Sequence, residues 1–151
     1  MRPPRSTISS PAYGPTYRPE PTDTVRFLSQ DWLDLQKGLA ERLPERPGAT
    51  ARVQYVVTGA PDGEVRYFQS WLDGRLGDSG LGDDQDAELT YRLAYVDARQ
   101  IAEGALDANV AFMQGRVKVT GDMGKVMALM PLTSSDDHHA AVLEISAQTD
   151  Y

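Results

Sequence analysis

The stretch Ala111–Leu129, AFMQGRVKVTGDMGKVMAL, changes its hydrophobic period in the middle. Val117 and Val119 alternate with polar neighbours, which predicts a short strand over 116–120. Gly121-Asp122 follows at once and predicts a turn, because these residue types favour turn conformations. A strand that turns directly into a helix is therefore expected here.

The residues on either side of that strand have helical spacing. Asp107 can cap a short helix that carries Phe112, and Gly115 can end it. After the turn, apolar residues recur at i, i+3, i+4 and i+7, and Pro131 is expected to end that helix. These apolar residues are Met123, Val126, Met127 and Met130.

Upstream, the chain has the alternation of a sheet. Runs 51–58 and 64–72 flank the turn sequence APDG and predict a β-hairpin. The segment 73–86 is rich in glycine and aspartate, which predicts a loop. A third alternating run, 87–95, predicts another strand.

Helices are predicted outside this sheet. Before it, five apolar residues form a stripe that Ser29 can cap and Pro44 ends. After it, Asp97 with Gln100 resembles a capping box for a helix that includes Ile101. The end of the chain, 134–151, fits a helix or a strand. The stripe before the sheet comprises Leu28, Trp32, Leu35, Leu39 and Leu43.

Composition limits the classes of function. The chain has 151 residues, a net charge of −7 and no cysteine, which argues against a nucleic-acid binder, an anionic-membrane binder and thiolate zinc sites. No apolar run is long enough to span a membrane, and no secretory signal is expected at the start. Arginine outnumbers lysine twelve to three, a balance that fits a bacterial cytoplasmic protein.

Six of the ten prolines lie in residues 1–24, which are predicted to form a disordered Pro-rich tail, followed by one domain over 25–151. Recruitment of a protein partner by this tail is one open alternative. The prolines of the tail are Pro3, Pro4, Pro11, Pro15, Pro19 and Pro21.

Three motifs are interpreted as structural. The acidic residues between Asp78 and Glu88 do not follow the spacing of a calcium loop and are predicted to be solvated. The glycines between Gly77 and Gly82 lack the rest of a phosphate-binding motif. The adjacent side chains of His138 and His139 point apart on a helix or a strand, so surface positions are expected.

The segment 111–129 resembles the signature of the sterol carrier protein 2 (SCP2) family: AFM-x-G, a strand, then G-D-M-G and an apolar helix. The resemblance extends over about 25–150. It implies an α+β fold, with a five-stranded, mostly antiparallel sheet and helices packed on one face around an apolar tunnel.

The resemblance also implies a function, the non-enzymatic binding and transfer of a hydrophobic ligand such as a fatty acid, an acyl-CoA or a sterol. It implies no catalytic residue, no cofactor and no metal. Arg116, Lys118 or Lys125 could orient an anionic head group. The residues expected to line the tunnel are Phe112, Met113, Met123, Val126, Met127 and Met130, together with Ile101 and Leu106.

An enzyme of specialised metabolism on the same scaffold, catalysing cyclisation or isomerisation, is the alternative. Tyr91, Tyr95 or Asp97 would then act as acid or base at the mouth of the pocket. A buried carboxylate or tyrosine with a shifted pKa inside the cavity would favour this alternative.

Overall fold

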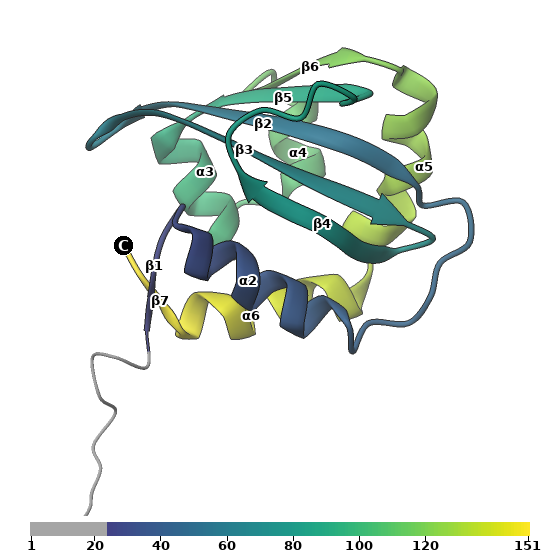
Figure 1. Cartoon of the computed structure of the whole chain (residues 1–151), viewed down its shortest axis with the longest axis horizontal. Helices are drawn as coiled ribbons and strands as arrows, with labels where there is room; N and C mark the ends of the chain where they lie inside the picture. The colour runs from purple at the N-terminus through teal and green to yellow at the C-terminus, as the bar shows by residue number, and fades with distance from the viewer. Residues whose placement is uncertain (1–23) are drawn as a thin grey trace, which may run out of the picture.

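The computed structural model of the protein describes residues 24–151, so the tail expected over 1–24 lies, except for Thr24, outside the described residues. Five strands form the main sheet in the order β4-β3-β2-β5-β6 (Figure 1). Within this sheet, β2 and β5 pair in parallel and the other neighbours are antiparallel. The expected five-stranded, mostly antiparallel sheet is confirmed. Its strands are β2 (Ala51–Ala60), β3 (Gly63–Leu72), β4 (Arg75–Leu81), β5 (Leu89–Ala94) and β6 (Val117–Gly121).

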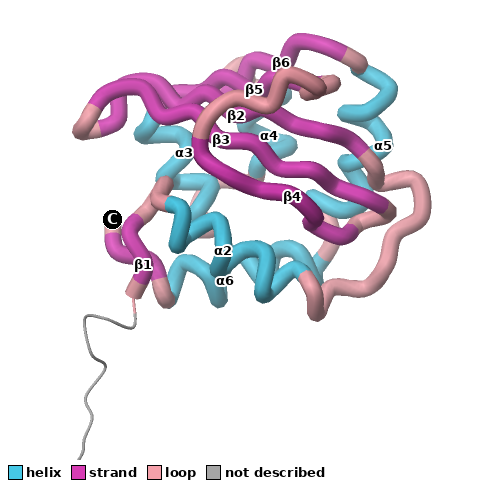
Figure 2. The backbone as a smooth tube through the Cα atoms, in the orientation of Figure 1, coloured by secondary structure: helices cyan, strands magenta, loops and turns pink. Residues whose placement is uncertain are grey.

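Five helices cover one face of this sheet, and α2 and α6 lie side by side across it (Figure 2). Two short strands, β1 (Val25–Arg26) and β7 (Thr149–Asp150), pair in parallel and join the two ends of the described chain. The fold is therefore a two-layer α+β arrangement. The helices are α2 (Gln30–Ala40), α3 (Tyr95–Ala102), α4 (Ala108–Met113), α5 (Met123–Thr133) and α6 (Asp136–Ala147).

The predicted turn at Gly121-Asp122 connects the main sheet to α5 through backbone and side-chain hydrogen bonds. Gly121 pairs with Leu89 at the end of β6. The next backbone N–H, of Asp122, donates to the Glu88 carbonyl oxygen at 3.0 Å. The Asp122 carboxylate then caps α5 by accepting from the backbone N–H of Gly124 at 2.9 Å. One dipeptide thus ends the strand and starts the helix.

Other local predictions divide into confirmed and wrong ones. Ser29 caps α2 and Asp107 caps α4, as expected. The capping box at Asp97 is wrong, because α3 starts earlier and Asp97 lies in its first turn. Pro131 does not end α5, since the missing N–H removes a single bond near the end of the helix. The segment at the end of the chain is a helix, α6.

The segment expected to be a loop, 73–86, contains the edge strand β4. The backbone of β4 pairs with β3, so the expectation of a loop is wrong. An edge strand is held by backbone hydrogen bonds to one neighbour and needs few apolar side chains, so its sequence can resemble that of a loop. Gly80 makes room for Phe68, whose ring would lie 3.1 Å from a Cβ added at Gly80. Glycine here therefore marks a close packing contact within a sheet.

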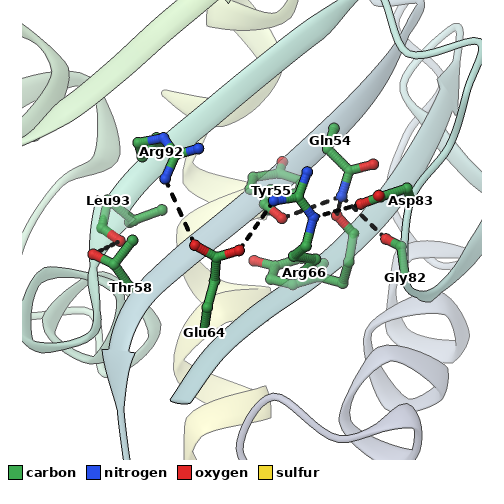
Figure 3. A network of polar contacts seen from close by, with 10 residues as sticks. Gln54, Tyr55, Thr58, Glu64, Arg66, Gly82, Asp83, Arg92 and Leu93 are labelled. Carbon is green, nitrogen blue, oxygen red and sulfur yellow. Dashed lines mark hydrogen bonds and ion pairs between the residues drawn. The ribbon is translucent and has the colours of Figure 1, made fainter.

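The acidic segment after β4 crosses the face of the sheet that has no helices. Gln54 anchors it: its side-chain amide donates to the Gly82 carbonyl oxygen at 3.0 Å, and its side-chain oxygen accepts from the Asp84 N–H at 2.8 Å. Arg66 pairs with Asp83 at 2.6 Å beside this anchor (Figure 3). Arg52 pairs with Asp84 at 2.9 Å and, chiefly through this hydrogen bond, lowers the pKa of Asp84.

The acidic loop is thus held to the sheet by two arginines and by a glutamine that is only 4% exposed. The expectation of a solvated loop is wrong for Asp84, whose side chain is 7% exposed. Within residues 24–151, no group of His, Cys, Asp and Glu has the arrangement of a metal site. Nor does any helix of this part of the chain have the length and apolar character needed to cross a membrane.

Candidate functional site

A cavity of about 210 Å³ lies between the sheet and the helices, with most of its wall apolar. It lies between the two buried clusters of the core, and Tyr55, Tyr91 and Val119 pack against both of these clusters. Each of the five helices in residues 24–151 contributes to its wall, so the cavity involves the whole helical layer. The apolar helix residues at its wall include Ile101, Phe112, Val126, Leu129, Met130 and Ile145.

A row of aromatic rings forms the wall on the side of the sheet. Tyr55 stacks on Tyr67 with ring centroids 4.6 Å apart, and Tyr91 meets Tyr55 edge-on at 5.4 Å. Trp32 of α2 meets Tyr67 edge-on at 5.6 Å. The row follows from strand register, because Tyr55 lies opposite both Tyr67 and Tyr91 in the sheet. Such rings give a rigid apolar surface that carries polar groups.

Burial raises the pKa of all three tyrosine hydroxyls, those of Tyr55, Tyr67 and Tyr91. They therefore stay protonated over the physiological pH range. The neighbouring Trp71 side chain lowers the pKa of Tyr55, but by less than burial raises it. In this state the tyrosines can donate hydrogen bonds to a ligand, but they cannot act as bases.

Polar side chains also enter the cavity from several other elements. Gln69 of β3 donates to the side-chain oxygen of Gln36 of α2 at 2.9 Å. On the opposite side, Thr133 donates to the side-chain oxygen of Asn109 at 3.3 Å. Among the described residues, no Asp, Glu, Lys or Arg lines the cavity. The wall is thus apolar with a few neutral hydrogen-bonding groups, as in many small-molecule sites.

His138 also lines the cavity, so the expected surface position is wrong for this residue, whereas His139 is exposed. Ser135 caps α6 by accepting from the backbone N–H of His138 at 3.1 Å. The helix then places His138 on the same side as Ala141 and Ile145. This i, i+3, i+7 spacing is the sequence signal that could have placed His138 inside.

We expect the free energy of unfolding to fall as the pH drops below about 6.5. Burial, reinforced by the nearby charge of His139, lowers the pKa of His138 and outweighs the opposite effect of Asp107. Below pH 6.5 the unfolded chain therefore binds a proton that the native state does not. The contribution of His138 to the free energy of unfolding is therefore fully present above pH 6.5, and it is lost as the pH falls towards the pKa of His138 in the native state. Urea unfolding at a series of pH values measures it.

Two matched variants separate this effect from the titration of carboxylates. His138→Leu should flatten the pH dependence just below 6.5, because it removes the buried imidazole. His139→Leu, in the neighbouring exposed position, should keep most of the dependence, because burial is the largest cause of the lowered pKa of His138 and the charge of His139 adds less to it. Equal slopes for the two variants would contradict the assignment to His138.

The structure divides the residues expected to line the tunnel. Ile101, Phe112, Val126 and Met130 lie at the cavity wall. Leu106 is partly buried in the core beside the cavity, without lining it. The other three residues are largely exposed, namely Met113 at 80%, Met123 at 48% and Met127 at 65%. A role in binding stays a prediction for all of them.

The charged residues considered as head-group or acid–base partners lie outside the cavity. Lys125 pairs with Glu88 at 3.4 Å, and Arg116 lies 3.9 Å from Asp97. Lys118 is exposed in β6. The polar residues that do line the cavity, such as Gln36 and Asn109, belong to no sequence motif, so the sequence does not predict them as site residues. They come from separate elements, so no spacing along the chain relates them.

Solved structures with the same fold support the architecture. A conserved hypothetical protein from Thermus thermophilus is similar with a TM-score of 0.66 and 14% identity, covering 80% of this chain and 90% of that chain. A crystal structure of sterol carrier protein 2 has a TM-score of 0.64 and 12% identity, and the match covers 79% of this chain and 98% of that chain. Palmitated SCP2L2 from Aedes aegypti has a TM-score of 0.55 and 16% identity, and the match covers 70% of this chain and 94% of that chain. At these identities the likeness shows the fold.

No curated protein matches the sequence. The family model of the SCP-2 sterol transfer family matches residues 35–134, which is more than half of the chain. The matched segment runs from α2 to the end of α5 and includes the whole main sheet. The chain therefore belongs to the SCP-2 sterol transfer family.

Proposed function

We propose that this protein binds a hydrophobic ligand in the cavity between its sheet and its helices, and carries it as a transfer protein. The observation that carries the proposal is the apolar cavity of about 210 Å³ inside the fold. Moving an apolar chain from water into such a cavity gains about 25 cal/mol for each Å² buried. Membership of a sterol transfer family supports the same conclusion.

The size of the cavity favours a single-chain lipid. Its volume lies below the range of about 300–1,000 Å³ that is typical of pockets for larger ligands. A structural relative is described in its palmitated form, which supports one acyl chain as the occupant of this fold. We infer that fatty-acid-like molecules fit better than lipids with two chains.

The uncharged wall indicates how a charged ligand would sit. A carboxylate or a CoA phosphate would find no Lys or Arg among the described lining residues. Burial of an unpaired charge is costly, so such a group would remain outside the cavity. Buried tyrosines with a raised pKa do line the cavity, which is the observation expected to favour the enzyme alternative. Because these tyrosines stay protonated, they supply hydrogen-bond donors and no base, and no carboxylate lines the cavity among the described residues. Binding is therefore the function that this chemistry supports.

Direct binding of lipids tests the proposal. Both tryptophans of the chain, Trp32 and Trp71, line the cavity, so their fluorescence should report its filling. We expect delipidated protein to bind single-chain lipids of the size of decanol or dodecanol with micromolar affinity and a rise in melting temperature. A phospholipid with two chains should bind more weakly. If no fatty acid, fatty alcohol, sterol or acyl-CoA changes either signal, the proposal is wrong.

A further inference from the structure

Two buried hydrogen-bond donors in the cavity wall have no partner. They are the indole N–H of Trp32 and the side-chain amide N–H groups of Gln36. Both residues line the cavity, and Trp32 is only 6% exposed. Because they lie at i and i+4 on α2, the two side chains occupy one face of the helix. Buried donors without a partner are rare in native proteins and call for an explanation.

The neighbouring polar groups hold these donors in place without satisfying them. The Gln36 oxygen accepts from Gln69 at 2.9 Å, which orients the Gln36 amide and leaves its N–H groups free. Gln69 is only 4% exposed. Trp32 is wedged edge-on between the rings of Phe27 and Tyr67. The indole nitrogen of Trp71, the other tryptophan of the cavity, is not among the buried donors that lack a partner.

Resting on the proposed function, we propose that Trp32 and Gln36 form a subsite for an uncharged oxygen acceptor of the bound lipid, such as an ester, ketone or alcohol oxygen. The groups of this subsite that lack a partner are both donors, which suits a ligand group that accepts hydrogen bonds. No cation lines the cavity among the described residues. Burial also lowers the pKa of His138, so its imidazole is neutral near pH 7. A neutral head group therefore binds inside, and a carboxylate does not.

A matched series of ligands tests this subsite. Methyl laurate, laurate and dodecane share one chain and differ in their ends, and tryptophan fluorescence follows the binding of each at pH 7.5. We expect the wild-type protein to bind methyl laurate about tenfold or more tightly than dodecane, and more tightly than laurate. The infrared band of the ester carbonyl should move to lower frequency on binding, because the carbonyl oxygen accepts hydrogen bonds.

Variants then assign the effect to the two donors. Gln36→Leu and Trp32→Phe should each weaken binding of methyl laurate about tenfold, reduce the carbonyl shift and change binding of dodecane, which needs no hydrogen-bond donor, by much less. Trp71 remains as the fluorescent reporter in Trp32→Phe. Gln30→Leu, an exposed glutamine on the same helix, serves as the control and should behave as the wild-type protein does.

The outcomes separate this inference from the proposed function. If ester and alkane bind equally, if laurate binds tightest, or if the variants lose dodecane as much as methyl laurate, the subsite is wrong while lipid binding stands. If none of the three ligands binds, the proposed function fails together with the subsite. Loss of the ester preference and of the carbonyl shift in both variants, with a much smaller change in alkane binding, supports the subsite.

Discussion

Gly121→Ala is expected to lower the free energy of unfolding by about 3 kcal/mol or more, a large part of the stability of a domain of this size. Gly121 has a φ of +115°, which strains any residue with a side chain. An added Cβ would also collide with the carbonyl oxygen of Glu88 and lie 3.1 Å from the Cα of Leu89. Both neighbours are backbone at the start of β5, so relief requires the edge of the sheet to open.

Gly38→Ala provides the matched control, since it makes the same chemical change within α2. A Cβ at Gly38 meets nothing within 4 Å. This variant should therefore be stabilised by about 0.5–1 kcal/mol, because alanine favours helix. Urea unfolding of both variants gives the comparison. Equal stabilities for Gly121→Ala and the wild-type protein would contradict the close packing of β6 against β5.

This packing gives a physical reason for the motif from which the fold was predicted. In the sequence GDMG, the first glycine permits the backbone contact with β5, and Asp122 both donates to Glu88 and caps α5. These are local requirements, so local sequence could reveal them. The caps at Ser29 and Asp107 were predictable for the same reason. A cap needs only its own side chain and the next turn of helix.

The edge strand β4 was not predictable in this way. Its pairing with β3 depends on backbone hydrogen bonds to a neighbouring strand, and its glycines resemble those of a loop. In α2, the apolar stripe predicted from the spacing includes Leu35 and Leu39 but omits Leu33, which is fully buried. The direction in which a helix faces depends on what packs against it, and spacing alone fixes this only roughly.

In the candidate site, too, local sequence predicts some features, while others depend on how distant parts of the chain pack together. The helix α5 is apolar on most sides, so its sequence cannot tell that Met130 reaches the cavity while Met127 is 65% exposed. The polar groups of the cavity wall come from different elements, as Gln36 and His138 illustrate. Only the folded chain brings them together. The family signature thus predicted that a cavity exists, and the chemistry of its wall needed the structure.

Ala141→Phe is expected to weaken binding of single-chain lipids more than tenfold. Ala141 lies on α6 with its side chain at the cavity wall. A phenyl ring at this position occupies much of a cavity of about 210 Å³, and the space left is too small for an acyl chain. Because the ring fills empty space, the variant should remain folded without ligand. Tryptophan fluorescence titration with dodecanol measures the loss.

Ala140→Phe is the matched control, since it adds the same ring one residue earlier, on the exposed side of the same helix. It should bind dodecanol as the wild-type protein does, because its ring lies outside the cavity. Melting curves of both variants without lipid show whether each is folded. The decisive comparison is between two folded proteins that differ only in the side of α6 on which the ring lies. If Ala141→Phe binds as tightly as Ala140→Phe, the lipid binds elsewhere, and the cavity is not the binding site.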